Sequence, residues 1–195
     1  MRITEAGGSA DQLRALAALA TAVAASSLSA ELEAVAELVV TALRKGRSIF
    51  FCGNGGSAAN AQHLAAEYVV RFHRERRPLS ALALTTDSSV LTAGGNDFGF
   101  ATVFARQVEA LGRAGDMLFL HSTSGASENL LLAADAARAR DLTTIALLAR
   151  GGGRLRERVD RALVVPSDVT ARAQELHLAM GHVICDLVDR ALAES

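Results

Sequence analysis

A chain of 195 residues, half of them apolar, is long enough to bury the core of one domain. Its 20 basic and 21 acidic residues nearly balance, which argues against a nucleic-acid partner or a membrane surface, because both usually select a basic excess. Two distant cysteines, Cys52 and Cys185, exclude a disulfide scaffold and favour a reducing compartment. The first residues lack the apolar stretch of an export signal, so we expect a cytoplasmic protein.

Residues 1–45 predict a helical arm in front of the main domain, which we place at 46–195. The helical pattern breaks near residues 26–29, and Ser29 is the expected N-cap of the second helix. One face of that helix is apolar and carries Leu32, Val35, Leu38 and Val39. Because this face needs a partner surface, we expect it to pack against neighbouring subunits in a symmetric assembly.

Beyond residue 46 the pattern alternates between short β-rich runs and helices. The expected strands are 48–52, 79–84, 117–120, 142–148 and 162–165. The expected helices are 58–72, 126–139 and 170–192. Strands that alternate with helices predict βαβ units and a parallel sheet covered on both faces. The fold class is therefore α/β, a doubly wound five-stranded parallel sheet behind an N-terminal helical extension.

Two turns rich in glycine and hydroxyl groups each follow a strand and open a helix. They are CGNGGS at 52–57 and STSGAS at 122–127. Ligands of open α/β sheets bind outside the carboxyl ends of the strands, and helix N-termini favour anions. Hydroxyl groups that can donate to a phosphate belong to Ser57, Ser122, Thr123, Ser124 and Ser127. Each turn could simply cap its helix, but two turns at equivalent strand ends favour phosphate binding.

These turns differ from the common nucleotide-binding loops. The chain has neither the lysine of a G-x-x-x-x-G-K-[ST] loop nor a G-x-G-x-x-G motif. A nucleoside triphosphate or a dinucleotide is therefore a poor candidate, and a small phosphate monoester is a better one.

Two helices carry candidate acid/base or metal-ligating side chains. His63 and Glu67 are four residues apart and share one helix face, which suits two ligands of one metal ion or a base with its partner. Surface His/Glu pairs at this spacing are also common. Gln174 and His182 lie on the last helix, roughly 12 Å apart along its axis. These polar residues could equally form the solvated side of that helix.

Two further segments are polar. The loop at 94–100 places Asn96 and Asp97 between glycines and aromatic residues, either as a binding loop or as an ordinary turn between helices. The basic stretch from Arg71 to Arg77 is interpreted as a solvated helix end.

Taken together, these segments resemble the sugar isomerase (SIS domain) family, and within it the phosphoheptose isomerases. The resemblance spans nearly the whole chain and is carried by CGNGGS, AQHLAAE, RFHRERRP, GNDFGF, EALGRAGD, STSG and RAQELHLAMGH. It implies a flavodoxin-like sheet and a homotetramer. It also implies aldose–ketose isomerisation of sedoheptulose 7-phosphate to D-glycero-D-manno-heptose 7-phosphate, a step of bacterial heptose biosynthesis.

The same resemblance implies roles for individual residues. Glu67 matches the catalytic base and His182 its partner acid/base. Positions that match zinc ligands are His63, Glu67, Gln174 and His182. Positions that match substrate contacts are Asn54, Gly55, Gly56, Ser57, Glu67, Arg71, Asn96, Asp97, Ser122, Thr123, Ser124, Ser127 and Gln174. Because Gln174 and His182 are far apart on one helix, a single zinc site would need a bent helix or a neighbouring subunit, and we expect an active site between subunits.

Two non-enzymatic alternatives share the fold. An adaptor that binds the replication initiator DnaA also has the run SAANAQH, but it lacks the Glu and His that this chain has at Glu67 and His182. A sugar-phosphate sensor would normally be fused to a DNA-binding module, for which this length leaves no room. Ala171, where some isomerases have an acidic residue, and His121 depart from the family pattern and leave the fine substrate preference open.

Overall fold

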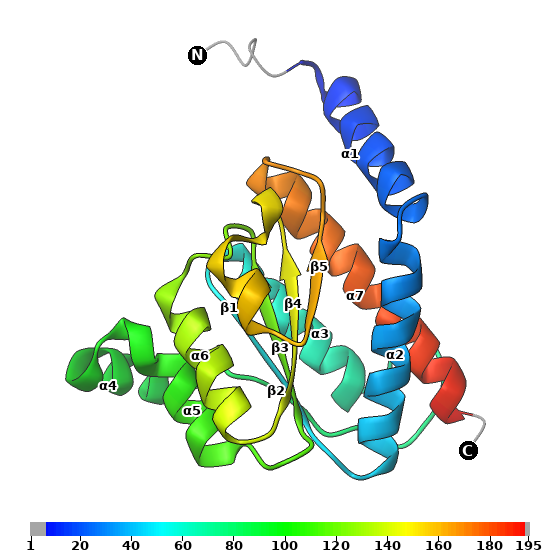
Figure 1. Ribbon diagram of the computed structural model, residues 1–195. Coiled ribbons are helices and arrows are strands. Elements are labelled where there is room, and N and C mark those ends of the chain that lie inside the picture. The colour runs from blue at the N-terminus through cyan, green and yellow to red at the C-terminus, as the bar shows by residue number, and fades with distance from the viewer. Residues whose placement is uncertain (1–6, 194–195) are drawn as a thin grey trace.

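A parallel sheet of five strands forms the centre of the molecule, and helices cover both of its faces (Figure 1). In the computed structural model, which describes residues 7–193, the strand order is β2-β1-β3-β4-β5, and every neighbouring pair is parallel. The strands are β1 Ile49–Gly53, β2 Ala81–Ala83, β3 Met117–Ser122, β4 Thr143–Leu148 and β5 Arg161–Val164. This arrangement confirms the doubly wound α/β fold and its five-stranded parallel sheet.

The helices form two layers around the sheet. They are α1 Ser9–Ala24, α2 Leu28–Arg44, α3 Gly56–Val69, α4 Ser88–Phe98, α5 Val103–Leu111, α6 Glu128–Ala139 and α7 Thr170–Ala193. Two 3-10 segments, η1 Phe100–Thr102 and η2 Arg150–Arg158, complete the set. One hydrophobic cluster joins α2, α3 and α7 to one face of the sheet, and a second joins α5, α6 and η2 to the other.

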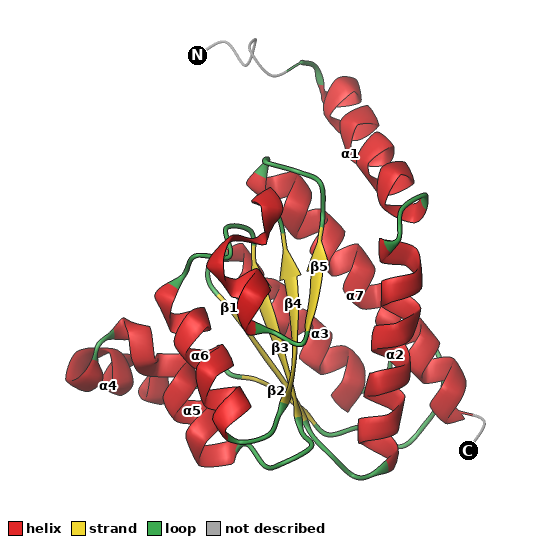
Figure 2. Cartoon of the chain, viewed as in Figure 1, coloured by secondary structure: helices red, strands yellow, loops and turns green. Residues whose placement is uncertain are grey.

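The buried strands explain why two cores form. Successive side chains of a strand point to opposite faces, so Ile49 and Phe51 of β1 enter the first cluster, whereas Phe50 and Cys52 enter the second. All residues of β1 and β3 are buried, as expected for central strands of a parallel sheet. The strand arrows all lead to one edge of the sheet (Figure 2).

Local details correct three expectations. The helix after the first turn begins at Gly56 rather than residue 58 and ends at Val69 rather than residue 72. Ser29 lies inside α2 and is not its N-cap; the hydroxyl of Ser26 accepts the N–H of Leu28 instead. The loop expected at 94–100, either a binding loop or a turn between helices, lies mostly within α4, and α5 follows it. Every residue of α4 is at least partly exposed, so this helix has no fully buried face.

The apolar face of α2 is covered within this chain. Leu32, Val35 and Val39 are buried in the core cluster shared with α3 and α7, so this stripe carries no argument for subunit contacts. Helix α1 extends away from the sheet layers (Figure 1). Within residues 7–193, no single helix has the length and apolarity to span a membrane. Helices α1 and α2, which are bent by 70° at their break, have that length and composition only when taken together.

Candidate functional site

A cavity of about 310 Å³ opens at the carboxyl ends of β1 and β3. It brings together both glycine- and serine-rich turns and the start of α7. Its lining residues are Asn54, Gly55, Gly56, Ser57, His121, Ser122, Thr123, Ser124, Ser127, Leu130, Thr170 and Gln174. The two turns that the sequence singles out therefore form one site, together with α3 and α6, which begin at Gly56 and Glu128.

The second turn is shaped by its backbone. Gly125 has φ +60°, and a Cβ there would lie 1.8 Å from the carbonyl oxygen of Gly152, so only glycine fits. The Oγ of Ser122 accepts the N–H of Gly125 at 3.0 Å, and the Oγ of Ser124 accepts the N–H of Ala126 at 3.3 Å. A hydroxyl that accepts such a bond still has its own hydrogen to donate. The turn is thus held open while its hydroxyl hydrogens remain available to an anion.

A pair of side-chain amides ties the two turns together. The Nδ2 of Asn54 donates to the Oδ1 of Asn129 at 3.0 Å, and the Nδ2 of Asn129 donates back to the Oδ1 of Asn54 at 2.9 Å. Asn129 lies on α6 and is buried. Asn129 is not among the residues predicted from the sequence, although an amide at the start of an otherwise apolar helix is a signal that could have identified it. The pair fixes the first turn relative to the second.

A second group of candidate side chains lies further along the helices that border the cavity. His63 and Glu67 come from α3 and His182 from α7, and their ligating atoms all lie within 4.8 Å of one another. The Nε2 of His63 is 2.8 Å from the Nε2 of His182 and 3.2 Å from the Oε1 of Glu67. The side chains of His63 and Glu67 are 46% and 20% exposed. The structure therefore joins the His63–Glu67 pair to His182.

The donor set of this group fits a zinc ion. Two imidazole nitrogens and a carboxylate are ordinary zinc ligands, and ligands bonded at about 2.1 Å in a tetrahedron lie roughly 3.4 Å apart. The 3.2 Å between the Nε2 of His63 and the Oε1 of Glu67 is close to this value, whereas the 2.8 Å between the two imidazole nitrogens is shorter. Burial lowers the pKa of His182, His63 lowers it further, and Glu67 opposes them, so the net shift is downward. A lowered pKa favours the neutral imidazole, which is the form that binds a metal or accepts a proton.

Gln174 lies in the cavity rather than among these three residues. Its side-chain amide packs so close to Gly56 that a Cβ at that glycine would meet the amide oxygen at 2.6 Å. Gln174 and His182 are both on α7, and their separation along the helix keeps the amide of Gln174 beside the two glycine- and serine-rich turns.

Four of the predicted substrate contacts lie outside the cavity: Glu67, which belongs to the second group, and Arg71, Asn96 and Asp97. Arg71 follows α3, is exposed and lies 3.8 Å from Glu75. Asn96 and Asp97 lie near the end of α4, where the Nδ2 of Asn96 donates to the Oδ1 of Asp97 at 2.7 Å. Figure 1 shows α4 on the outer side of α5. The fold of one chain does not bring these residues to the cavity.

His121 is an unusual part of the cavity wall. It is the last residue but one of β3 and is fully buried, and within the described residues neither ring nitrogen has a hydrogen-bond partner. Burial lowers its pKa to about 3, with a smaller contribution from His177. The Nε2 of His177 lies 3.0 Å from the carbonyl oxygen of Leu148. His121 is therefore neutral throughout the physiological range.

Comparison with known proteins identifies the family. Residues 13–149 match the SIS domain family. The chain is 48% identical over 185 residues to the phosphoheptose isomerase of Akkermansia muciniphila, an alignment that covers 95% of this chain and 93% of that protein. The chain belongs to the phosphoheptose isomerases of the SIS domain family. A further member, from a Roseiflexus species, is 54% identical over 83% of this chain and 82% of its own length.

Solved structures of the family agree with this assignment. A phosphoheptose isomerase from Francisella tularensis has a TM-score of 0.89 at 37% identity and covers 94% of this chain and 100% of its own. The enzyme from Neisseria gonorrhoeae has a TM-score of 0.81 at 44% identity, with 93% and 94% covered. These comparisons confirm the resemblance drawn from the sequence motifs and place this chain among aldose–ketose isomerases.

Proposed function

We propose that the chain isomerises sedoheptulose 7-phosphate to D-glycero-D-manno-heptose 7-phosphate in bacterial heptose biosynthesis. The observation that carries this proposal is the division of the site along two helices. Helix α3 contributes Ser57 to the cavity and Glu67 to the second group, and α7 contributes Gln174 and His182 in the same order. A heptose phosphorylated on C7 reacts at C1 and C2, so it needs a phosphate subsite and a separate reaction centre.

The side chains of the second group can move the required protons. The Glu67 carboxylate takes a proton from C1 of the open-chain ketose and returns it to C2, through an enediol. His182 transfers a proton between the oxygens on C1 and C2, for which a neutral imidazole is suited, since it can accept a proton at one oxygen and donate it at the other. Phosphate binding in the cavity holds the remote end of the sugar and so orients the two reacting carbons.

Zinc is the cofactor that this reaction centre would hold. His63, Glu67 and His182 supply three ligands within 4.8 Å of one another. The fourth ligand that the resemblance implies, Gln174, would come from a neighbouring subunit, because the Gln174 of the same chain lies in the cavity. When bound, zinc would polarise the carbonyl group of the sugar. The sheet has its own core, so chelation is expected to abolish turnover with little change in Tm, and added zinc to restore it. Full turnover in protein shown by elemental analysis to be metal-free would remove zinc from the proposal.

Assembly into a homotetramer with sites between subunits is supported by α4. Val90, Phe98 and Phe100 in and after this helix are 41%, 56% and 60% exposed, which is unfavourable unless another subunit covers them. Asn96 and Asp97 match substrate contacts yet lie outside the cavity of their own chain. A neighbouring subunit that receives α4 would satisfy both observations.

Co-expression of two inactive variants tests shared sites. Asp97→Ala and Glu67→Gln each disable one contribution, so mixed oligomers would regain some intact sites if the two residues come from different subunits. Light scattering on the purified protein gives the subunit number. A monomer at micromolar concentration, or no recovered activity in verified mixed oligomers, would contradict the shared site.

The substrate is tested directly by incubating purified protein with sedoheptulose 7-phosphate and detecting the aldose by nuclear magnetic resonance. Sedoheptulose without phosphate and fructose 6-phosphate are the comparison substrates. We expect conversion of the first compound and much slower conversion of the others, since only the first joins a phosphate to a seven-carbon chain. Lack of any conversion, together with binding to a purified initiator protein, would favour the adaptor alternative.

We place the enzyme in the cytoplasm, where buried free thiols such as Cys52 and Cys185 are stable.

A further inference from the structure

The basic stretch after α3 is partly buried, contrary to the solvated helix end that the sequence suggests. The side chain of Arg76 is 2% exposed and that of Asp189, on α7, is 1% exposed, and the Nε of Arg76 lies 2.6 Å from the Oδ1 of Asp189. Every other ion pair found among residues 7–193 is at least partly exposed. This pair therefore differs from the surface pairs of the molecule.

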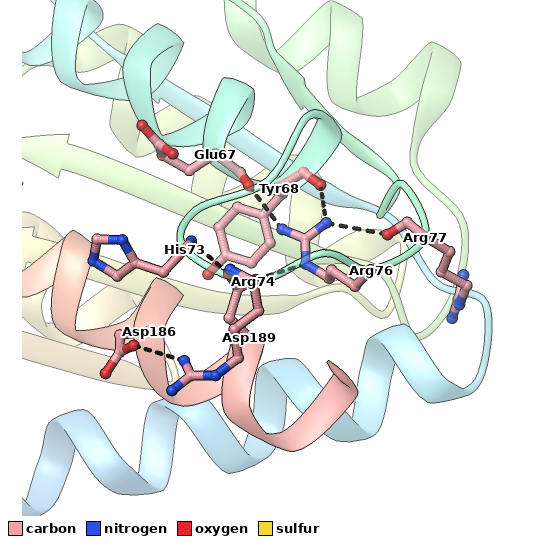
Figure 3. Close-up of polar contacts among 8 residues, drawn as sticks. All are labelled: Glu67, Tyr68, His73, Arg74, Arg76, Arg77, Asp186 and Asp189. Carbon is pink, nitrogen blue, oxygen red and sulfur yellow. Dashed lines mark hydrogen bonds and ion pairs between the residues drawn. The ribbon is translucent and has the colours of Figure 1, made fainter. Parts of the chain in front are cut away.

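Asp189 anchors the stretch to α7. Its Oδ2 accepts the backbone N–H groups of His73 at 2.9 Å and Arg74 at 3.1 Å, while its Oδ1 accepts the Nε of Arg76 (Figure 3). Both carboxylate oxygens are thus occupied. Asp186, one turn earlier on α7, pairs with Arg74 at the rim of the same contact.

Arg76 holds the end of α3 at the same time. One terminal nitrogen of its guanidinium donates to the carbonyl oxygen of Glu67 at 2.8 Å, and the other donates to the carbonyl oxygen of Tyr68 at 2.9 Å. The last four carbonyls of a helix have no partner inside the helix, and α3 ends at Val69, so these two acceptors are of that kind. A cation at this end also complements the helix dipole.

The geometry points to the Arg76–Asp189 pair as a positioning device for the reaction centre, a role that rests on the proposed function of Glu67 and His182. Asp189 lies seven residues after His182, hence on the same face of α7. Arg76 bonds the backbone of Glu67 itself. The pair links the last turn of α3 to α7 and so fixes the separation of Glu67 from His182.

General energetics support positioning over simple stabilisation. A buried ion pair seldom stabilises a fold more than apolar residues of similar volume, because burying both charges is costly. An apolar pair could fill the same space, but it could not bond the carbonyls of Glu67 and Tyr68. The forked guanidinium does so in three directions at once, which lysine cannot reproduce.

The test compares Arg76→Met, Arg76→Lys and Asp189→Asn with Arg158→Met. Arg158 forms a partly exposed pair with Asp135 on the opposite face of the sheet, so it controls for loss of an arginine ion pair. For Arg76→Met we expect kcat with sedoheptulose 7-phosphate to fall about a hundredfold with KM nearly unchanged, as for a misplacement of about 1 Å. The kcat values of Arg76→Lys and Asp189→Asn should lie between those of Arg76→Met and the wild type. The kcat of Arg158→Met should match that of the wild type.

A second readout does not depend on turnover. Zinc affinity, measured by competition with a fluorescent chelator, should weaken about tenfold or more in Arg76→Met, because partners behind metal ligands typically have effects of this size. If wild-type protein failed to turn over the sugar, the proposed function would fall while zinc affinity still tested the pair. Folded Arg76→Met or Asp189→Asn protein with wild-type kcat and zinc affinity, and only a lower Tm, would show that the pair merely stabilises the fold. Asp189→Asn decides the matter if Arg76→Met does not fold.

Discussion

The cavity between the two glycine- and serine-rich turns and the His63–Glu67–His182 group are built in different ways. The cavity is shaped by backbone turns at the sheet edge, where Ser57 and Ser122 are each only 4% exposed and an added Cβ at Gly125 would clash. The proposed reaction centre, His63–Glu67–His182, consists of partly exposed side chains from two helices. The first region depends on turns that the chain makes locally, whereas the second depends on how α3 and α7 pack. Substitutions should therefore separate binding from chemistry.

Glu67→Gln should have the largest effect, and it should act on the chemical step rather than on phosphate binding. The amide keeps the shape of the side chain but cannot take a proton, so kcat is expected to fall about 10²- to 10⁴-fold. KM and the affinity for inorganic phosphate should change little, because the cavity is untouched. Steady-state kinetics and calorimetry measure both. Glu75→Gln, at a side chain that is 94% exposed, is the control, and near wild-type kcat in Glu67→Gln would remove Glu67 as the base.

Gly125→Ala should disturb the second turn of the cavity and lower the stability of the fold, whereas Glu67→Gln should leave both unchanged. Overpacking against Gly152 adds to the strain of a left-handed residue, so we expect a loss of about 3 kcal/mol or more in the free energy of unfolding. Gly151→Ala is the matched control, because Gly151 also has a positive φ, at +74°, but its Cβ would meet nothing within 4 Å. The control should lose only about 1–2 kcal/mol. Urea unfolding curves for both variants that coincide would refute the tight contact.

Ser57→Ala and Ser124→Ala should each weaken sugar-phosphate binding while leaving kcat at saturation near the wild-type value. Loss of one charge-assisted hydrogen bond in a buried site is expected to cost about 1–3 kcal/mol, or roughly 5- to 150-fold in affinity. Ser80→Ala, at the opposite end of the sheet beside Ser48, provides the control. Calorimetry that finds unchanged phosphate affinity in both cavity variants would mean that the turns only cap their helices.

Mild acid should produce the smallest effect, and it should act on the cavity wall. Because burial lowers the pKa of His121 from 6.5 to about 3, the unfolded chain takes up a proton at higher pH than the folded protein. The resulting stability is present above pH 6.5 and is lost as the pH falls towards 3. The slope is at most about 1.4 kcal/mol per pH unit for one group.

His121→Leu should flatten this dependence, whereas His73→Leu, at an exposed histidine, should not. Urea unfolding at several pH values between 7 and 5 gives the slope of each variant. An equal slope in wild type and His121→Leu would assign the acid sensitivity to other groups, of which buried His177, whose pKa is also lowered, is the first to examine.

The sequence alone determined the sheet and the phosphate-type turns of this protein. The β-rich runs predicted as strands at 48–52 and 117–120 overlap the observed buried strands, and the glycine and serine residues that follow them indicate turns, because both signals arise from neighbours in the chain. The i, i+4 spacing of His63 and Glu67 likewise needs only one helix.

Only the tertiary structure decided which of the remaining polar residues meet. It placed His182 beside His63 across two helices, left Gln174 in the cavity, and buried Arg76 of a stretch that reads as a solvated helix end. It also formed α4, a helix none of whose residues is buried. Each of these outcomes depends on contacts between segments far apart in the chain, and the local periodicity and charge of a segment do not predict which distant segment it will contact.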